Sequence, residues 1–110
     1  MKRTNRVGAV ECIRNREEFV ASSLSGARGW ATGLLGPRLR LRFLKDAPVY
    51  VVYSYATPIA WLPAHGPGRW IAPRHRYSVT TSAHQTIVAA AVDPQWLNDD
   101  GEEVEGRWGR

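Results

Sequence analysis

The chain has 110 residues, of which 44% are hydrophobic, and its formal net charge is +5. This length suits one domain and is too short for two ordinary ones. The single cysteine, Cys12, excludes an intramolecular disulfide and the paired-cysteine metal motifs. No apolar run approaches the ~20 residues that a membrane helix needs. We therefore expect a soluble, cytoplasmic domain without a cofactor.

Charge is distributed unevenly, with a net +6 over residues 1–46 and a net −3 over residues 98–110. We expect residues 1–14 to form a loose basic arm that could include a short strand. Residues 15–97 are expected to form the folded domain, and residues 98–110 an acidic, disordered tail. A basic body suits an anionic partner, nucleic acid first. The alternative is that the arginines only solvate the surface.

The first predicted element is a helix that begins after Asn15, a favourable N-cap residue followed by two glutamates in the first turn. It would end at Gly26, and the glycine-rich residues 26–38 would form a loop that lacks the spacing of phosphate-binding motifs. Apolar and basic residues alternate in "RLRLRF", residues 38–43. This alternation predicts a half-buried strand with three arginines on its open face.

The next predicted element is a central strand at residues 49–55, "VYVVYSY", where β-branched and aromatic residues dominate. Thr57 and Pro58 predict a turn. Shorter strands are expected at residues 59–62, 69–71 and 77–81. A helix should follow Ser82 and end at Asp93, although a strand over residues 86–88 is an alternative. Trp96 and Leu97 could then fold back onto the core.

These elements predict an α+β fold in a single domain. Its antiparallel sheet would have about four strands, with an N-terminal helix and a helix after the last strand packed on one face. In a symmetric hairpin, Trp61 and Trp70 would form an aromatic cross-strand pair.

The hydroxyl-rich segment before the second helix is interpreted first as a helix cap. Ser82 and Gln85 have the spacing of a capping box, and amides of such a helix start could also bind an anion. His84 could serve as a base, but no orienting carboxylate can be assigned to it. We therefore assign no catalytic residue and expect a non-enzymatic protein, with a small nuclease or hydrolase that uses His84 as the alternative. The three histidines are ten and nine residues apart and fit no metal-ligand spacing.

Arginines and aromatic residues could together form a binding surface if their strands are neighbours. Such a surface would resemble a platform on which single-stranded nucleic acid stacks. Burial of the aromatic rings in the core is the alternative. The predicted binding residues for nucleic acid or a protein partner are Arg38, Arg40, Arg42, Trp61, Arg69, Trp70, Arg74 and Arg76.

Two segments resemble a small domain of unknown function carried by bacterial viruses and plasmids, mostly those of actinobacteria. They are "YVVYSYATPIAW" (50–61) and "RYSVTTSAHQ" (76–85), which are similar to the pattern Y-V-V-Y-S-Y-x-T-P-I-A followed by Y-S-x-T-T-S-x-H-Q. The resemblance covers roughly residues 15–88. It implies an accessory protein expressed in a bacterial host, and it implies no established activity.

The two segments would meet if the strand at 49–55 paired with the strand at 77–81. A polar cluster would then form at one end of the sheet, either as a site or as a buried structural network. Its predicted members are Tyr55, Thr57, Thr81, Ser82, His84 and Gln85.

The predicted function is that of a small phage- or plasmid-encoded accessory protein that binds nucleic acid or a host protein through its basic, aromatic surface. The alternative is a host-takeover or anti-defence inhibitor of one bacterial protein. The sequence predicts neither the target nor an oligomeric state.

Overall fold

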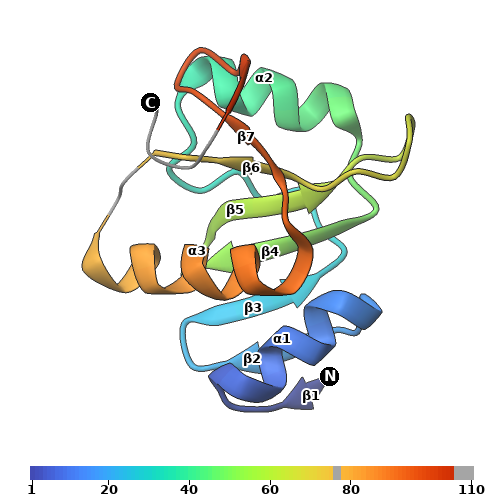
Figure 1. The fold of residues 1–110 in the computed structure, drawn as a ribbon, viewed down its shortest axis with the longest axis vertical. Coiled ribbons are helices and arrows are strands. Elements are labelled where there is room, and N and C mark those ends of the chain that lie inside the picture. The colour runs from blue at the N-terminus through green and yellow to red at the C-terminus, as the bar shows by residue number, and fades with distance from the viewer. Residues whose placement is uncertain (76–77, 106–110) are drawn as a thin grey trace.

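The computed structural model describes residues 1–75 and 78–105. Within these residues the fold is α+β, with three helices and one mixed sheet whose eight strands follow each other in chain order (Figure 1). The helices are α1 (Arg6–Asn15), α2 (Pro37–Asp46) and α3 (Val79–Val92). The strands are β1 (Lys2–Arg3), β2 (Phe19–Ala21), β3 (Leu24–Ala27), β4 (Tyr50–Ser54), β5 (Thr57–Leu62), β6 (Ile71–Pro73), β7 (Gln95–Leu97) and β8 (Glu103–Val104).

The prediction of about four antiparallel strands with both helices on one face was wrong. The sheet has eight strands and is mixed, because β1 pairs with β2 and β6 pairs with β7 in parallel. Helices α1 and α3 lie side by side on one face, and α2 covers the other (Figure 1). No helix of the described residues is long and apolar enough to span a membrane.

Strand β4 separates two hydrophobic cores because its side chains alternate between the faces of the sheet. Tyr50 and Val52 belong to the core under α1 and α3, whereas Val51 and Tyr53 belong to the core under α2. All five residues of β4 are buried, which agrees with the prediction of a central strand covered on both faces.

The N-terminal third differs from the prediction. Residues 1–14 contain β1 and most of α1, and Asn5 is the N-cap because its side chain accepts a hydrogen bond from the amide of Gly8 at 2.8 Å. The helix expected after Asn15 is instead the hairpin of β2 and β3. Alternate residues of the hairpin are buried. One of them, Gly26, lies so close to Tyr50 that a Cβ there would collide with the Tyr50 hydroxyl. A two-residue period of burial therefore outweighed the helix-capping signal.

The arginine-rich segment predicted as a strand is helix α2. Gly36 is the N-cap and Pro37 starts the helix, where its fixed φ and missing N–H are tolerated. Leu39 and Phe43, four residues apart, are the buried residues of the helix, whereas Leu41 is exposed. The alternation of Leu and Arg was misleading, because only the 39/43 pair lies on the face toward the sheet.

The C-terminal third also begins its helix earlier than predicted. Ser78, and not Ser82, is the N-cap of α3, and its hydroxyl accepts from the Thr81 amide at 3.1 Å. The predicted strand at 77–81 is thus wrong for residues 79–81, and Tyr77 lies outside the described residues. The expected turn at 57–58 is the start of β5. Instead of facing Trp70, Trp61 is paired with Ile71 across the hairpin.

The segment after α3 is more ordered than expected. Trp96 and Leu97 fold back onto the core as predicted, and they do so as part of β7. The chain then turns and adds β8 to the edge of the sheet. The predicted disordered tail therefore contains a strand, and residues 106–110 lie outside the described part of the chain.

Candidate functional site

A chain of hydrogen bonds joins the end of β4 to the first two turns of α3. The Ser54 hydroxyl lies 3.0 Å from Oγ1 of Thr81 and 2.7 Å from Nδ1 of His84. The Ser78 hydroxyl donates to Oγ1 of Thr81 at 3.2 Å and extends the chain to the N-cap of α3. The two sequence segments of the resemblance therefore meet, but through a helix packed on the sheet and not through paired strands.

One consistent set of directions begins at the Ser78 hydroxyl. Because Ser78 donates to Thr81, the Thr81 hydroxyl can donate to Ser54, and Ser54 can donate to Nδ1 of His84. With these directions Nδ1 accepts and the ring carries its proton on Nε2. Burial lowers the pKa of His84 below its ordinary value, and the positive charge of Arg6 lowers it further. The imidazole is therefore neutral at pH 7.

This arrangement resembles a serine–histidine pair but is closed to a substrate. Ser54 is 2% exposed and His84 is 1% exposed, so neither group can reach a reacting atom from solvent. The described residues contain no group of three or more His, Cys, Asp or Glu side chains that could hold a metal ion. The chain of hydrogen bonds is therefore a structural connection that fixes α3 on β4.

The other predicted members of the polar cluster are distributed around this connection. Gln85 is buried, and its amide nitrogen donates to the carbonyl oxygens of Pro73 and His75 at 3.2 and 2.9 Å. Thr57 accepts a hydrogen bond from the Leu34 amide at 2.9 Å. Tyr55 is exposed in the turn between β4 and β5, where its φ of 59° is left-handed. Ser82 is half-buried on α3, and its carbonyl accepts from the Thr86 hydroxyl.

Sequence reasoning left Ser54, the central residue of the connection, out of the predicted cluster. The available signal was its place at the end of an otherwise apolar strand, where a buried hydroxyl needs a partner. Ser78 was also missed as a cap, although Ser78 and Thr81 have the same three-residue spacing as Ser82 and Gln85.

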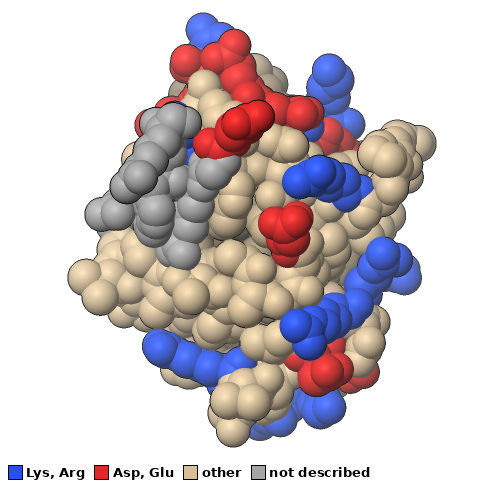
Figure 2. All heavy atoms as spheres, viewed as in Figure 1, with Lys and Arg blue, Asp and Glu red and all other residues tan. Residues whose placement is uncertain are grey.

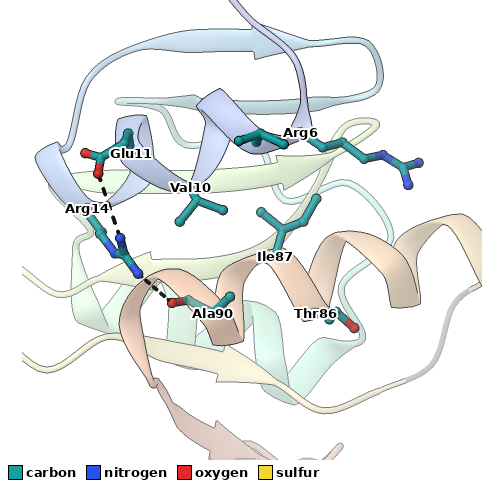
Figure 3. Close-up of a pocket in the computed structure, with 8 residues that line it drawn as sticks. Arg6, Val10, Glu11, Arg14, Thr86, Ile87 and Ala90 are labelled. Carbon is teal, nitrogen blue, oxygen red and sulfur yellow. Dashed lines mark hydrogen bonds and ion pairs between the residues drawn. The ribbon is translucent and has the colours of Figure 1, made fainter.

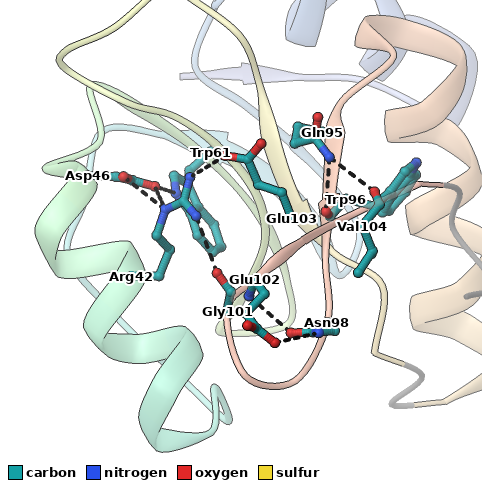
Figure 4. A network of polar contacts seen from close by, with 10 residues as sticks. All are labelled: Arg42, Asp46, Trp61, Gln95, Trp96, Asn98, Gly101, Glu102, Glu103 and Val104. Carbon is teal, nitrogen blue, oxygen red and sulfur yellow. Dashed lines mark hydrogen bonds and ion pairs between the residues drawn. The ribbon is translucent and has the colours of Figure 1, made fainter.

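The predicted basic and aromatic residues do not share one exposed face. Trp61 is fully buried under α2, and its indole N–H donates to Asp46 at 2.8 Å (Figure 4). Trp70 is buried in the opposite core, where its ring packs edge-on against Tyr50. Neither ring is therefore available for stacking on a base.

Arg42 is bound on three sides. Its guanidinium forms an ion pair with Asp46 at 3.1 Å and another with Glu103 at 3.6 Å, and it donates to the Gly101 carbonyl at 3.3 Å (Figure 4). These contacts join α2 to the turn before β8. Glu103 and Gly101, in the segment that was expected to be disordered, therefore hold one of the six predicted binding arginines.

The remaining predicted arginines occupy separate places. Arg38 and Arg40 are exposed on α2, and Arg38 lies 4.0 Å from Asp100. Arg69 is exposed before β6, and Arg74 is half-buried after it. Arg76 lies outside the described residues.

A groove that sequence reasoning missed runs between α1 and α3 (Figure 3). It has a volume of about 490 Å³, and most of the surface that lines it is apolar. Arg6 lies at the end where α3 begins, whereas Glu11 and Arg14 lie at the other end (Figure 3). The lining residues are Arg6, Val7, Val10, Glu11, Arg14, Thr86, Ile87 and Ala90.

The outward side of α3 continues this apolar surface. Val79, Ala83, Thr86 and Ala90 follow helical spacing along it, and the helix has no Asp, Glu, Lys or Arg in its 14 residues. Figure 2 shows the result as an uncharged belt over α3, with charged residues above and below it. Val7 and Val79 are 81% and 89% exposed. We call the groove and this side of α3 the α1–α3 face. Its signal in the sequence was the uncharged run from Val79 to Val92.

The chain was compared with protein-family profiles, curated proteins and solved structures. No curated protein and no solved structure matches it. One family profile, described as a family of unknown function (DUF8033), matches residues 9–101. The match includes the segments joined by Ser54, Thr81 and His84, the whole of α3, and most of α1. The chain therefore belongs to the DUF8033 family of unknown function.

Proposed function

We propose that this protein is a small, non-enzymatic accessory protein of a bacterial virus or plasmid that acts in the bacterial cytoplasm by associating with a protein partner through the α1–α3 face. A host-takeover or anti-defence inhibitor would act in this way. Burial of Ser54 and His84 argues against the nuclease or hydrolase alternative.

The observation that carries this proposal is the uncharged outward side of α3. A surface helix of a soluble protein ordinarily presents charged and polar residues to water. Helix α3 instead presents Val79, Ala83, Thr86 and Ala90 beside an apolar groove. Contiguous exposed apolar surface of this kind marks interaction sites.

The proposal predicts that a charge introduced on this surface abolishes association. Ala90→Glu places a carboxylate on the exposed side of α3, and Leu41→Glu is the matched control on α2, where Leu41 is 68% exposed. Both tagged variants and the wild type would be used to capture proteins from bacterial lysate and from a solution of the untagged chain. We expect the wild type and Leu41→Glu to retain a partner that Ala90→Glu loses. Equal capture by all three, or no capture by any, would exclude the α1–α3 face as the functional surface.

Nucleic-acid binding is a second candidate because two other aromatic residues are exposed. Trp30 and Tyr55 are 59% and 63% exposed, and Arg28, Arg38 and Arg40 are exposed as well. Gel-shift titrations with single- and double-stranded DNA and RNA at two salt concentrations test this function. It predicts a salt-dependent shift that Trp30→Ala weakens. The absence of any shift at low salt would contradict it.

A further inference from the structure

We infer that the partner of the α1–α3 face is a second copy of this chain, bound in an antiparallel orientation about a two-fold axis. The inference rests on the proposed role of this face and assigns its occupant. The charges at the two ends of the groove and the common direction of its two helices support it.

The α1–α3 face is electrostatically polar along its length. Helices α1 and α3 both begin at the same end of the face, so their positive dipole ends lie together (Figures 1 and 3). Arg6 adds a full positive charge at this end, and no ion pair joins it to another described residue. At the opposite end lie the C-termini of both helices and the carboxylate of Glu11.

Arg14 offsets part of this polarity, at the C-terminus of α3. Its guanidinium points at the last turn of α3 and donates to the carbonyl oxygens of Ala90 and Ala91 at 3.1 and 3.3 Å. Its positive charge therefore compensates the carbonyl end of α3. One carboxylate oxygen of Glu11 lies 3.8 Å from Arg14, and the other accepts a hydrogen bond from the Asn15 amide at 3.5 Å, but the side chain is 68% exposed. The Glu11 carboxylate thus remains accessible to a group from outside the chain.

A two-fold axis near the middle of the groove makes this polar face complementary to itself. The axis superposes the positive end of one copy on the negative end of the other, so that Arg6 of each copy faces Glu11 of the other. The small side chains of Ala83, Thr86 and Ala90 allow the two α3 helices to approach closely. Val10 and Ile87 would lie in the apolar centre of the interface, where charge is disfavoured.

The inference is tested by reversing the charge of Arg6 in one variant and of Glu11 in another, and then mixing the two variant proteins. Sedimentation velocity from ~1 µM to ~1 mM should show the wild type moving from monomer toward a dimer of twice 12.3 kDa. Arg6→Glu and Glu11→Arg should each weaken the dimer by about tenfold or more, because like charges then meet twice. An equimolar mixture of the two variants should restore dimerisation, since each opposing pair is again of opposite sign. Thermal unfolding of each variant confirms that the monomer is folded.

Three results would overturn the inference: a wild type that stays monomeric, a dimer that both charge variants retain, or a mixture that remains monomeric after both variants dissociate. These results are distinguishable from failure of the proposed function. If the wild type is monomeric but captures another protein that Ala90→Glu loses, the face keeps its function and the second copy is not its partner. If the wild type is monomeric and captures nothing, both proposals fail.

Discussion

Ser54 is the residue on which the connection between sheet and helix depends. Its single hydroxyl lies within hydrogen-bond distance of both Thr81 and His84, and all three side chains are buried. A buried polar group that loses its partner keeps its desolvation cost, which is about 1–3 kcal/mol. The connection is therefore more sensitive to loss of Ser54 than to loss of an exposed hydroxyl.

Ser54→Ala should lower the free energy of unfolding by about 1–3 kcal/mol, because it leaves Thr81 and Nδ1 of His84 without this partner. Ser25→Ala on neighbouring β3 is the control, and its half-buried hydroxyl has no hydrogen bond to another described side chain. We expect Ser25→Ala to change stability by less than about 0.5 kcal/mol. Urea unfolding of both variants measures the difference, and equal losses would contradict the assignment.

His84 should make stability depend on pH below neutrality. Its pKa in the folded chain lies below the ordinary value of 6.5, so the unfolded chain takes up a proton at higher pH than the folded chain does. The stabilisation that neutral His84 gives the folded chain is complete above pH 6.5 and is lost as the pH falls below it. The free energy of unfolding then changes by at most about 1.4 kcal/mol per pH unit.

Urea unfolding at several pH values between 7.5 and 5 tests this linkage. His84→Gln should reduce the dependence, whereas His65→Gln, at an exposed position in the loop before β6, should retain it. If His84→Gln is too unstable to measure, titration of the His84 ring by NMR gives its pKa directly. A His84 pKa at or above 6.5 would show that the neutral, Nδ1-accepting state is wrongly assigned.

At the scale of elements, Arg42 makes more contacts than Arg38 between α2 and the turn before β8. Arg42 contacts Asp46, Glu103 and the Gly101 carbonyl, while Arg40 is exposed and forms no ion pair with another described residue. Arg42→Ala should lower the free energy of unfolding by about 1–3 kcal/mol, since it leaves Asp46 with only the Trp61 indole as a donor. Arg40→Ala should change it by less than about 0.5 kcal/mol. Equal effects in thermal or urea unfolding would refute the role of Arg42.

The elements also show which sequence signals were reliable. Strand β4 was predicted because burial on both faces demands a continuous apolar run rich in β-branched and aromatic residues. Helix α2 was missed because its Leu–Arg alternation also fits a strand, and only contact with the sheet selects Leu39 and Phe43 as the buried pair. Residues 38–43 form a helix, and Trp61 and Trp70 are buried in opposite cores. The expected basic, aromatic surface on neighbouring strands is therefore absent from the described residues.

For the whole molecule, the sheet was underestimated because its extra strands are short. Strands β1, β6, β7 and β8 have two or three residues each, too few for a recognisable two-residue period. The parallel pairs of β1 with β2 and of β6 with β7 join segments distant in sequence, which local patterns cannot indicate. The meeting of the two resembling segments was anticipated, but its geometry was not, because α3 approaches β4 from above the sheet.

In the view of Figure 2, an uncharged belt over α3 lies between regions that carry charged residues of both signs. Association of the α1–α3 face with a protein partner can be followed at its methyl groups, by NMR spectra recorded on dilution of the chain and on addition of bacterial lysate. We expect the methyl signals of Val10, Ile87 and Ala90 to shift or broaden while those of Leu41 and Leu44 on α2 stay in place. Unchanged signals from the α1–α3 face in both titrations would contradict it.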